Sequence, residues 1–368
     1  MSRADRVVHI GKRLQRAHRS DLVVVTSRHG QSLEDLCQPF DHVVVDPTRM
    51  PIIVSARYLV PFLTLPRSSS RLARYLVATA RANQSKILVA TDAVEVLTEV
   101  KNLAPDLTVF AVLHGFYINQ GTGTRFREPW ISEHSSDVEL FAFGEYDIQN
   151  YRRWGNRHAK IHPSGSLNNC AYRLQAGSPP KKIFDLCIVE GSVNPKAEDF
   201  FSKVRLSNWE KIVDFVARAQ RDHGLRVAVA LSSSTKRDQV ATWFSERIGD
   251  IAYFTPPNEQ FATYRTIDAA KISIGETSTS LIEGLARRNK CIAMNFSDLQ
   301  VLNLPGHSLN VLRQPTYSDF TNRLNELFSM DDETYWNQIR QDVSHIINVD
   351  RQDFVIDDIR TRIREALN

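Results

Sequence analysis

Short, continuous apolar runs rich in β-branched residues recur along the chain. Runs that are apolar at every position are typical of parallel strands covered on both faces. We therefore expect strands at residues 21–27, 42–46, 86–91, 107–113, 138–144 and 159–165, and again at 183–191, 226–232, 271–275 and 291–295.

Between these runs, and after the last one, apolar residues recur at helical spacing. We expect helices at 70–84, 208–224, 317–329, 332–347 and 351–367. Gly224 ends the second of these, as is typical of a helix C-terminus. Alternating strands and helices predict an α/β fold in which each sheet is mostly parallel.

Two domains are expected, because 368 residues exceed the usual size of a single hydrophobic core. The segment 171–182 contains a glycine, a serine and two prolines and has no clear periodicity, so we interpret it as the linker. This places one α/β domain at residues 1–172 and a second at 173–350.

The composition is that of a soluble globular protein, with 42% hydrophobic and 24% charged residues. No run approaches the roughly 20 apolar residues that span a membrane, and the N-terminus lacks the apolar core of a secretory signal. The net charge of +4 is too small to indicate a nucleic-acid partner. The 4 cysteines are scattered, as expected of reduced, mostly buried thiols in a cytoplasmic protein.

Ligands of open parallel sheets bind beyond the carboxyl ends of the strands, so the residues that follow each run carry the functional prediction. His114 and Gly115 come directly after the run at 107–113. An imidazole with a pKa near 6.5 is suited to accept a proton at neutral pH, although a hydrogen bond to a neighbouring loop is an alternative role. Glu145 opens a predicted helix, where the helix dipole favours an acid, so capping and catalytic roles both stay open.

Small hydroxyl residues gather after three strands of the second domain, in the segments GSVNP, SSSTKRD and ETSTS. Amides and hydroxyls at helix N-termini bind phosphate well, and neighbouring cations add charge-assisted hydrogen bonds. The predicted phosphate site therefore comprises Gly191, Ser192, Asn194, Ser232, Ser233, Ser234, Lys236, Arg237, Glu276, Thr277, Ser278, Thr279 and Ser280.

Helix capping is the competing explanation for the hydroxyls near residue 280. Ser280 and Glu283 match the S/T-x-x-E capping box, which is worth about 1 kcal/mol. That box leaves Glu276 and the other three hydroxyls unexplained, so we favour phosphate binding and expect Ser280 to cap the helix as well.

These motifs resemble those of GT-B glycosyltransferases. Over about residues 107–295 the chain is similar to CDP-glycerol glycerophosphotransferases and related bacterial surface-carbohydrate transferases. The similarity lies in VLHG, in FGEYDIQNYRRWG followed by AKIHPSGSLNN, in GETST and in LIEGLARRNKCIAMN. The family usually has a His-Pro pair after the strand predicted at 226–232. This chain has Ser232, Ser233 and Ser234 there, which leaves the donor nucleotide open.

The resemblance implies two Rossmann-like domains that face a cleft. Residues 1–172 would be the acceptor side and 173–350 the donor-nucleotide side, and a C-terminal helix at 351–368 would return to the first domain. It implies that His114 is the catalytic base, with Glu145 as a further candidate, and that the hydroxyls of GETST take the donor phosphates. Gly115, Gly165 and Ser166 would lie in the cleft.

We therefore expect a glycosyltransferase that moves a sugar from a nucleotide-activated donor to a surface polysaccharide, such as lipopolysaccharide or capsule, or to a lipid-linked glycan. The chain has no D-x-D motif, so neither a metal nor a cofactor besides the donor is expected. A polyol-phosphate transferase, a nucleotide-sugar epimerase and a non-catalytic glycan- or partner-binding protein are the alternatives.

The first twenty residues carry six Lys or Arg against one Asp, and their apolar residues fall on one side of a helix. Such a segment favours peripheral contact with an anionic membrane on its inner face, where lipid-linked acceptors occur. A solvated leading helix is the alternative.

Overall fold

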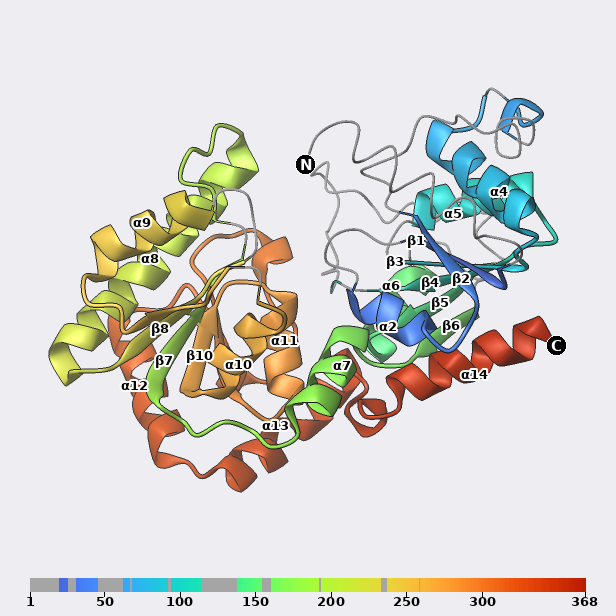
Figure 1. The fold of residues 1–368 in the computed structure, drawn as a ribbon. Helices are drawn as coiled ribbons and strands as arrows, with labels where there is room; N and C mark the ends of the chain where they lie inside the picture. Colours follow the sequence, from blue (N-terminus) through green and yellow to red (C-terminus); the bar gives the residue numbers. More distant parts are fainter. Residues whose placement is uncertain are drawn as a thin grey trace.

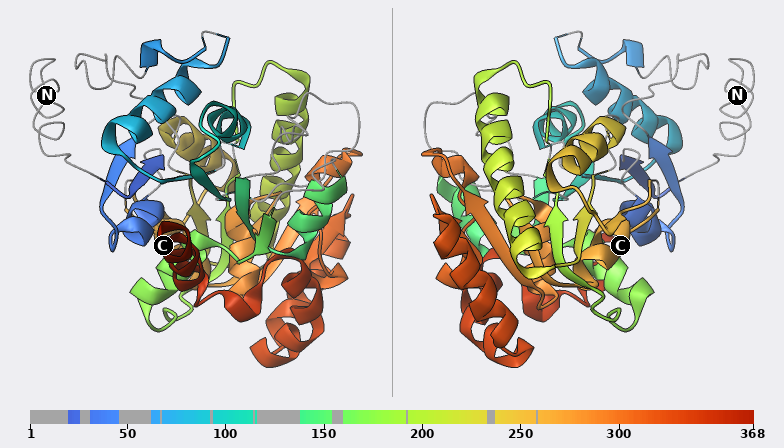
Figure 2. Two further views of the ribbon diagram at one scale, coloured as in Figure 1. Left: turned by 90° about the vertical axis from the view of Figure 1, so that its right-hand side faces the viewer. Right: turned by 90° about the vertical axis from the view of Figure 1, so that its left-hand side faces the viewer.

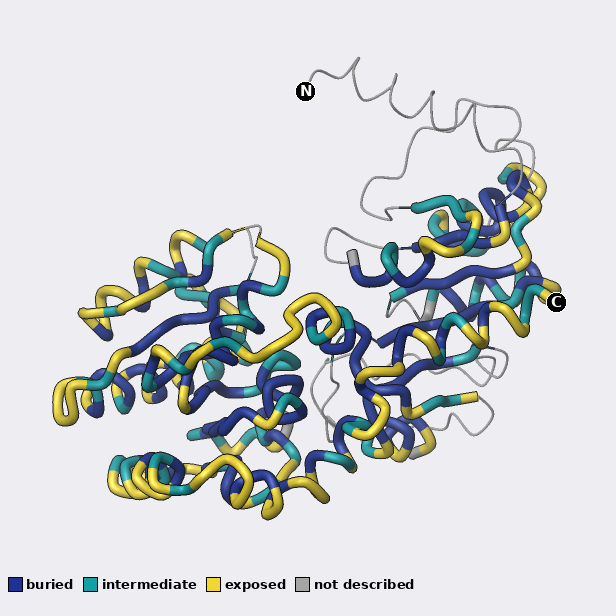
Figure 3. Tube along the Cα trace, turned by 60° about the horizontal axis from the view of Figure 1, so that its bottom comes forward, coloured by how far each residue is buried: buried dark blue, intermediate teal, exposed yellow. Residues whose placement is uncertain are grey.

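The computed structural model describes residues 20–25, 31–45, 62–66, 68–91, 94–113, 115, 138–153, 160–191, 193–232, 237–257 and 259–368. These residues form two lobes, each built on a six-stranded sheet in which all pairs of strands are parallel (Figure 1). Helices cover both sheets, and buried positions follow the strands and the inner faces of the helices (Figure 3). The expected α/β fold with two Rossmann-like domains is confirmed.

The first lobe has the strand order β2-β1-β3-β4-β5-β6. Its elements are β1 (Leu22–Val25), α2 (Gln31–Cys37), β2 (His42–Val45), α4 (Arg71–Asn83), β3 (Ile87–Thr91), α5 (Val94–Leu103), β4 (Thr108–Val112), β5 (Val138–Ala142), α6 (Glu145–Arg153), β6 (Lys160–Pro163) and α7 (Leu167–Ala176). The strands β1, β3, β4 and β5 are almost wholly buried, because their aliphatic side chains meet helices on both faces.

The second lobe has the strand order β9-β8-β7-β10-β11-β12. Its elements are β7 (Phe184–Val189), α8 (Phe200–His223), β8 (Val227–Ala230), α9 (Arg237–Ile248), β9 (Tyr253–Phe254), α10 (Ala262–Asp268), β10 (Ala270–Gly275), α11 (Thr279–Ala286), β11 (Lys290–Asn295), β12 (Val311–Arg313), α12 (Tyr317–Ser329) and α13 (Asp332–Ile346). This is the doubly wound order 3-2-1-4-5-6, in which the direction of winding reverses between β7 and β10. Ligands of doubly wound sheets bind outside the carboxyl ends of the two strands at such a reversal, so we call the loops after β7 and β10 the candidate crevice.

The chain returns to the first lobe after α13. The backbone N–H of Asn348 donates to the carbonyl of Phe143 at 2.8 Å, just beyond β5. The last helix, α14 (Val355–Leu367), then packs against α2, α7 and β3, and Arg360 donates to the carbonyl of Leu36 at 3.0 Å (Figure 2). The expected return of a C-terminal helix is confirmed.

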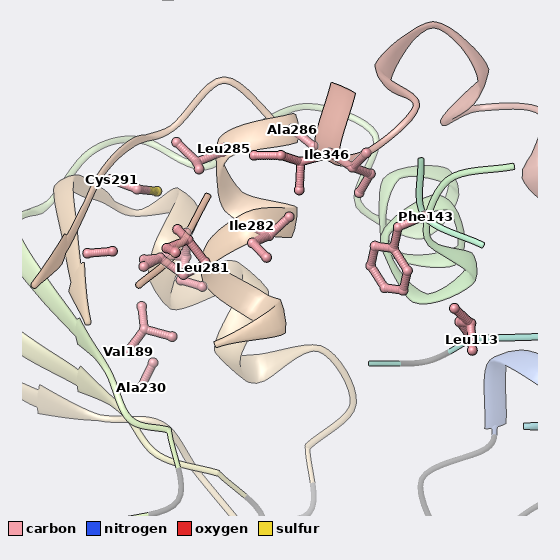
Figure 4. Packing of buried hydrophobic residues seen from close by; sticks show 14 of the residues in the cluster. Leu113, Phe143, Val189, Ala230, Leu281, Ile282, Leu285, Ala286, Cys291 and Ile346 are labelled. Atoms are coloured by element: carbon pink, nitrogen blue, oxygen red, sulfur yellow. The ribbon is translucent and has the colours of Figure 1, made fainter. Parts of the chain in front are cut away.

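The two lobes share one buried hydrophobic cluster. Figure 4 shows Ile346 of α13 between Ala286 at the end of α11 and Phe143 of the first lobe. A glycine beside this contact is sterically required: a Cβ atom on Gly144 would lie 2.6 Å from the carbonyl oxygen of Ile346. The returning chain thus approaches the end of β5 as closely as backbone atoms allow.

Two predictions about local structure need correction. The segment 171–182 is not a linker throughout, because residues up to Ala176 belong to α7, which Ser166 caps and which buries Cys170 and Tyr172. The helix expected at 208–224 ends as predicted at Gly224 but begins earlier, at Phe200, where Asp199 supplies the cap. The domain limits at residues 172 and 350 stay predictions. No helix in the described ranges is long and apolar enough to span a membrane.

Candidate functional site

The crevice at the reversal point is formed by the loops that follow β7 and β10. A Cβ atom on Gly191 would lie 3.2 Å from the carbonyl oxygen of Thr277 and 3.8 Å from Cβ of Ser278. It would also lie 3.5 Å from Nη2 of Arg205, a residue of α8. The structure therefore brings together three residues of the predicted phosphate site, and the glycine lets the loops after β7 and β10 pack in direct contact.

The four hydroxyl residues lie where α11 begins. Ser278 is the N-cap residue in extended conformation, and its side chain makes no capping hydrogen bond. Residues 277–280 are all half-buried. Amides at the start of a helix have no partner inside the helix, and the helix dipole places partial positive charge there. The start of α11 is thus suited to bind an anion.

The expected capping box at Ser280 is wrong. The helix begins at Thr279, so Ser280 is already its second residue and cannot cap it. Glu283 is buried and turned away from the helix start, where its carboxylate accepts hydrogen bonds from Ser166 of the first lobe and from Tyr264 at 2.7 Å. These two hydroxyl groups therefore hold the Glu283 carboxylate at the contact between the lobes.

Glu276, the residue directly after β10, is fully buried. Its carboxylate accepts from Nε of Arg205 at 2.7 Å and from the amide of Asn208 at 2.7 Å. Burial raises the pKa of Glu276, and the charge and hydrogen bonds of Arg205 and Asn208 act against that rise. Asn208 also accepts from the backbone N–H of Phe296 at 2.5 Å. Through Asn208, α8 is therefore bonded both to Glu276 in the loop after β10 and to the loop after β11.

Arg205 and Asn208 were missed at the sequence level because no motif surrounds them. Arg205 reaches the crevice directly, since its Nη2 donates to the carbonyl of Gly191 at 2.5 Å. The sequence contains one signal for it: an acid after a buried strand needs a partner when it is itself buried. The spacing of 71 residues between Arg205 and Glu276 gives no means of choosing that partner.

A second acid, Glu190, joins the loops after β7 and β8. Its carboxylate accepts from the backbone N–H of Val193 at 2.6 Å and from that of Ser232 at 3.0 Å. Arg237, at the start of α9, donates to the carbonyls of Leu231 at 3.2 Å and Ser232 at 3.1 Å. Partial burial lowers the pKa of Arg237 from its usual value. Ser232 and Arg237 therefore lie on the same edge of the sheet as Gly191.

The charged side chains described at this edge have hydrogen-bond partners within the protein. Glu276 pairs with Arg205 at 2.6 Å, and Arg237 turns its guanidinium onto backbone carbonyls and the hydroxyl of Thr255 at 3.1 Å. A phosphate bound here would depend chiefly on backbone amides and on helix N-termini rather than on these cations. The start of α11 is the helix terminus that lies next to Gly191, so its dipole acts at this point.

The remaining predicted residues are dispersed. Asn194 accepts from the backbone N–H of Lys196 at 3.3 Å, in the loop after β7. Glu145 is the exposed first residue of α6, and Gly115 is half-buried beyond β4. Gly165 and Ser166 are buried, Gly165 against the carbonyl of Asn348 and Ser166 against Glu283.

Five predicted residues lie outside the described ranges: His114, Ser192, Ser233, Ser234 and Lys236. Leu113, which follows β4 and precedes His114, is buried, and its backbone N–H donates to the carbonyl of Phe141 at 3.0 Å. In the described part of the chain, no three His, Cys, Asp or Glu side chains form a group that could hold a metal ion.

The sequence matches no family model and no curated protein sequence. Solved structures resemble it in fold. UDP-GlcNAc 2-epimerase from Neisseria meningitidis, bound to UDP-GlcNAc, has a TM-score of 0.60 at 9% identity, over 94% of this chain and 99% of that one. A glycosyltransferase from Rickettsia africae has a TM-score of 0.55 at 11% identity, over 95% and 99%.

Sucrose-phosphate synthase from Thermosynechococcus elongatus has a TM-score of 0.52 at 13% identity, over 95% of this chain and 100% of that one. Each similarity extends over both lobes, and at these identities it concerns the fold alone. The protein has the GT-B fold, in which two Rossmann-like domains are joined and the end of the chain returns to the first.

Proposed function

We propose that this protein is a glycosyltransferase that uses a nucleotide-activated sugar and binds the donor's phosphate at the start of α11. The observation that carries the proposal is the close approach of Gly191 to Thr277 and Ser278 at the reversal point, beside a helix start without a side-chain cap. The structural neighbours, which include a glycosyltransferase and proteins described with UDP-sugars, support a nucleotide-sugar donor.

In this proposal the second lobe stabilises the leaving group. An acceptor hydroxyl attacks the anomeric carbon, the carbon–oxygen bond to the phosphate breaks, and negative charge develops on the departing nucleotide. The amides and hydroxyls at the start of α11 neutralise that charge without rearranging. The pair of Glu276 and Arg205 holds the loop in place, and Lys236 is a further proposed contact to the phosphate.

His114 from the first lobe takes the proton of the attacking hydroxyl. An inverting outcome follows if the histidine acts as a simple base. Glu145, at the exposed start of α6, is proposed as a second acid of the acceptor side. The proposed acceptor is a surface polysaccharide or a lipid-linked glycan, and the basic N-terminal segment is proposed to contact the anionic membrane.

A nucleotide-sugar 2-epimerase is the second candidate, because the Neisseria epimerase has the TM-score of 0.60 while the Rickettsia transferase has 0.55. The two reactions differ in one requirement: an epimerase converts its donor without any acceptor. Incubation of each nucleotide sugar alone, followed by analysis of the sugar product, separates them. CDP-glycerol in the same panel tests for a polyol-phosphate transferase.

Donor binding is tested by calorimetry with UDP-, GDP-, CDP- and CMP-linked sugars. Two variants are matched: Ser280→Ala and Ser318→Ala change the second residue of α11 and of α12, respectively. A hydrogen bond to a charged group contributes about 1.5–3 kcal/mol, so Ser280→Ala should weaken the preferred donor roughly 10- to 100-fold. Ser318→Ala should bind as the wild type does. Failure of every donor to bind, or equal loss in both variants, contradicts the proposal.

A further inference from the structure

Helix α11 is attached to the first lobe by two buried polar contacts. The hydroxyl of Ser166 donates to the carboxylate of Glu283. One turn later, at the C-cap of α11, Nη1 of Arg287 donates to the side-chain oxygen of Asn169 at 2.7 Å. Ser166 and Asn169 lie at the start of α7, which packs on α2 and α14 of the first lobe. The helix that begins at the phosphate site therefore ends in contact with the other lobe.

Residues of the second lobe also bind the side chains of Glu283 and Arg287. Tyr264 donates to Glu283 at 2.7 Å. Burial and, after it, the charge of this carboxylate raise the pKa of Tyr264 well above its usual value, so its hydroxyl stays a donor. Arg287 pairs with Asp268 at 2.9 Å and lies over the rings of Tyr264 and Tyr172, at 4.7 and 5.1 Å from their centres.

Stability alone does not account for such a contact. The contact buries the charged groups of Glu283 and Arg287, which costs desolvation energy, and replacing a buried ion pair such as that of Arg287 with Asp268 by apolar residues of similar volume is often neutral or stabilising. Hydrogen bonding at this contact is incomplete. Among the described residues, Nη2 of Arg287 is buried without a hydrogen-bond partner, and so is Nε2 of Gln352, whose side-chain oxygen accepts from Asn169 at 2.6 Å. Hydrogen bonds do, however, fix orientation, because they weaken steeply away from a straight geometry.

The distance from this contact to the phosphate site is short. Glu283 lies five residues beyond the N-cap Ser278, which corresponds to about 7.5 Å along a helix. Gly284 packs tightly on α10, since a Cβ atom there would lie 3.1 Å from Cγ2 of Ile267. A helix held at that point turns as a rigid body, so a change at Glu283 moves the amides at the start of α11.

We propose that Glu283 and Arg287 are positioning residues, which set the orientation of the phosphate-binding start of α11 relative to the first lobe and its candidate base. The proposal rests on the proposed function. It predicts that loss of the bond from the first lobe misaligns donor and base while the donor still binds.

Two variants separate this role from a structural one, because each removes one hydroxyl from the same carboxylate. Ser166→Ala removes the bond from the first lobe and also the N-cap of α7, whereas Ser166→Gly removes the same bond and largely keeps the cap, because glycine is tolerated at an N-cap; these two variants of Ser166 should behave alike. Tyr264→Phe removes the bond from within the second lobe. We expect Ser166→Ala to lower kcat by on the order of 10- to 100-fold with an unchanged KM for the donor, as small misplacements of reacting groups do. Tyr264→Phe should keep kcat within about twofold, and Ser166→Thr, which retains the hydroxyl, should restore it.

A second measurement needs no activity. Spin labels at the exposed positions Asp106 and Lys203, one on each lobe, report the distance between the lobes by pulsed electron paramagnetic resonance. The distance distribution should shift or broaden in Ser166→Ala and stay unchanged in Tyr264→Phe. Identical distributions in both variants, or equal losses of kcat, overturn the inference. Absence of donor binding in the wild type would instead contradict the proposed function. The distance measurement would then still test whether the bond from Ser166 to Glu283 sets the orientation of the two lobes.

Discussion

Replacing Glu276 with alanine is expected to destabilise the second lobe strongly. The carboxylate is 0% exposed and accepts from both Arg205 and Asn208. Its removal leaves a guanidinium that is only 18% exposed without its counter-charge, and it opens a small cavity. Breaking a buried pair by removing one partner costs about 3–5 kcal/mol. Because Arg205 keeps some contact with solvent, we expect a value near the lower end, about 3 kcal/mol.

A double-mutant cycle tests whether the pair is the cause. Arg205→Met should cost at least as much as Glu276→Ala, because it leaves the fully buried carboxylate without its cation. The variant that carries both changes should lose clearly less than the sum of the two, with a coupling energy of about 0.5–3 kcal/mol. Lys271→Met is a suitable control, since its pair with Asp185 is on the surface and should contribute at most about 1 kcal/mol.

Urea unfolding followed by tryptophan fluorescence gives these free energies. Of the 5 tryptophans, Trp209, Trp243 and Trp336 belong to the second lobe, and Trp209 is fully buried next to Asn208. The transitions of the two lobes must be fitted separately, because proteins with two domains often unfold in more than one step. A loss below about 1 kcal/mol for Glu276→Ala, or additive effects in the double variant, would refute the role given to this pair.

Three further predictions concern other parts of the molecule. Gly144→Ala should lower thermal stability by about 1–3 kcal/mol, because its Cβ atom would lie 2.6 Å from the carbonyl oxygen of Ile346; an unchanged melting curve would contradict the close contact. His114→Ala should retain donor binding but lower turnover by on the order of 10² to 10⁴, and full activity in that variant would exclude the histidine as the base. The 4 cysteines should react with a thiol reagent only after unfolding, because burial raises the pKa of Cys37 and of Cys291 to about 12; rapid labelling of the native protein would show that they are accessible.

The sheets and the position of the crevice could be predicted from the sequence, because each depends on local pattern. Continuous apolar runs identified both sets of central strands, and the residues after β7, β8 and β10 lie on one edge of one sheet, as parallel strands require. The edge strands β9 and β12 were not predicted, since they have only two and three residues. So short a segment carries no periodicity.

The partners of the buried acids could not be predicted from the sequence. Glu283 matched a capping motif, but in the folded protein its carboxylate accepts from Ser166, 117 residues earlier in the chain. In the same way, the proline and glycine content of 171–182 obscured α7, whose formation depends on its N-cap at Ser166 and on the burial of Tyr172. Side-chain contacts of this kind depend on how the two lobes pack, and local pattern does not encode that packing.

The most direct test of the central claim is a crystal structure of the protein with its preferred nucleotide or nucleotide sugar. We predict a phosphate whose oxygens lie about 2.7–3.2 Å from backbone nitrogens at the start of α11, between Gly191 and Ser280. A nucleotide bound elsewhere, with the crevice between β7 and β10 empty, would contradict the account.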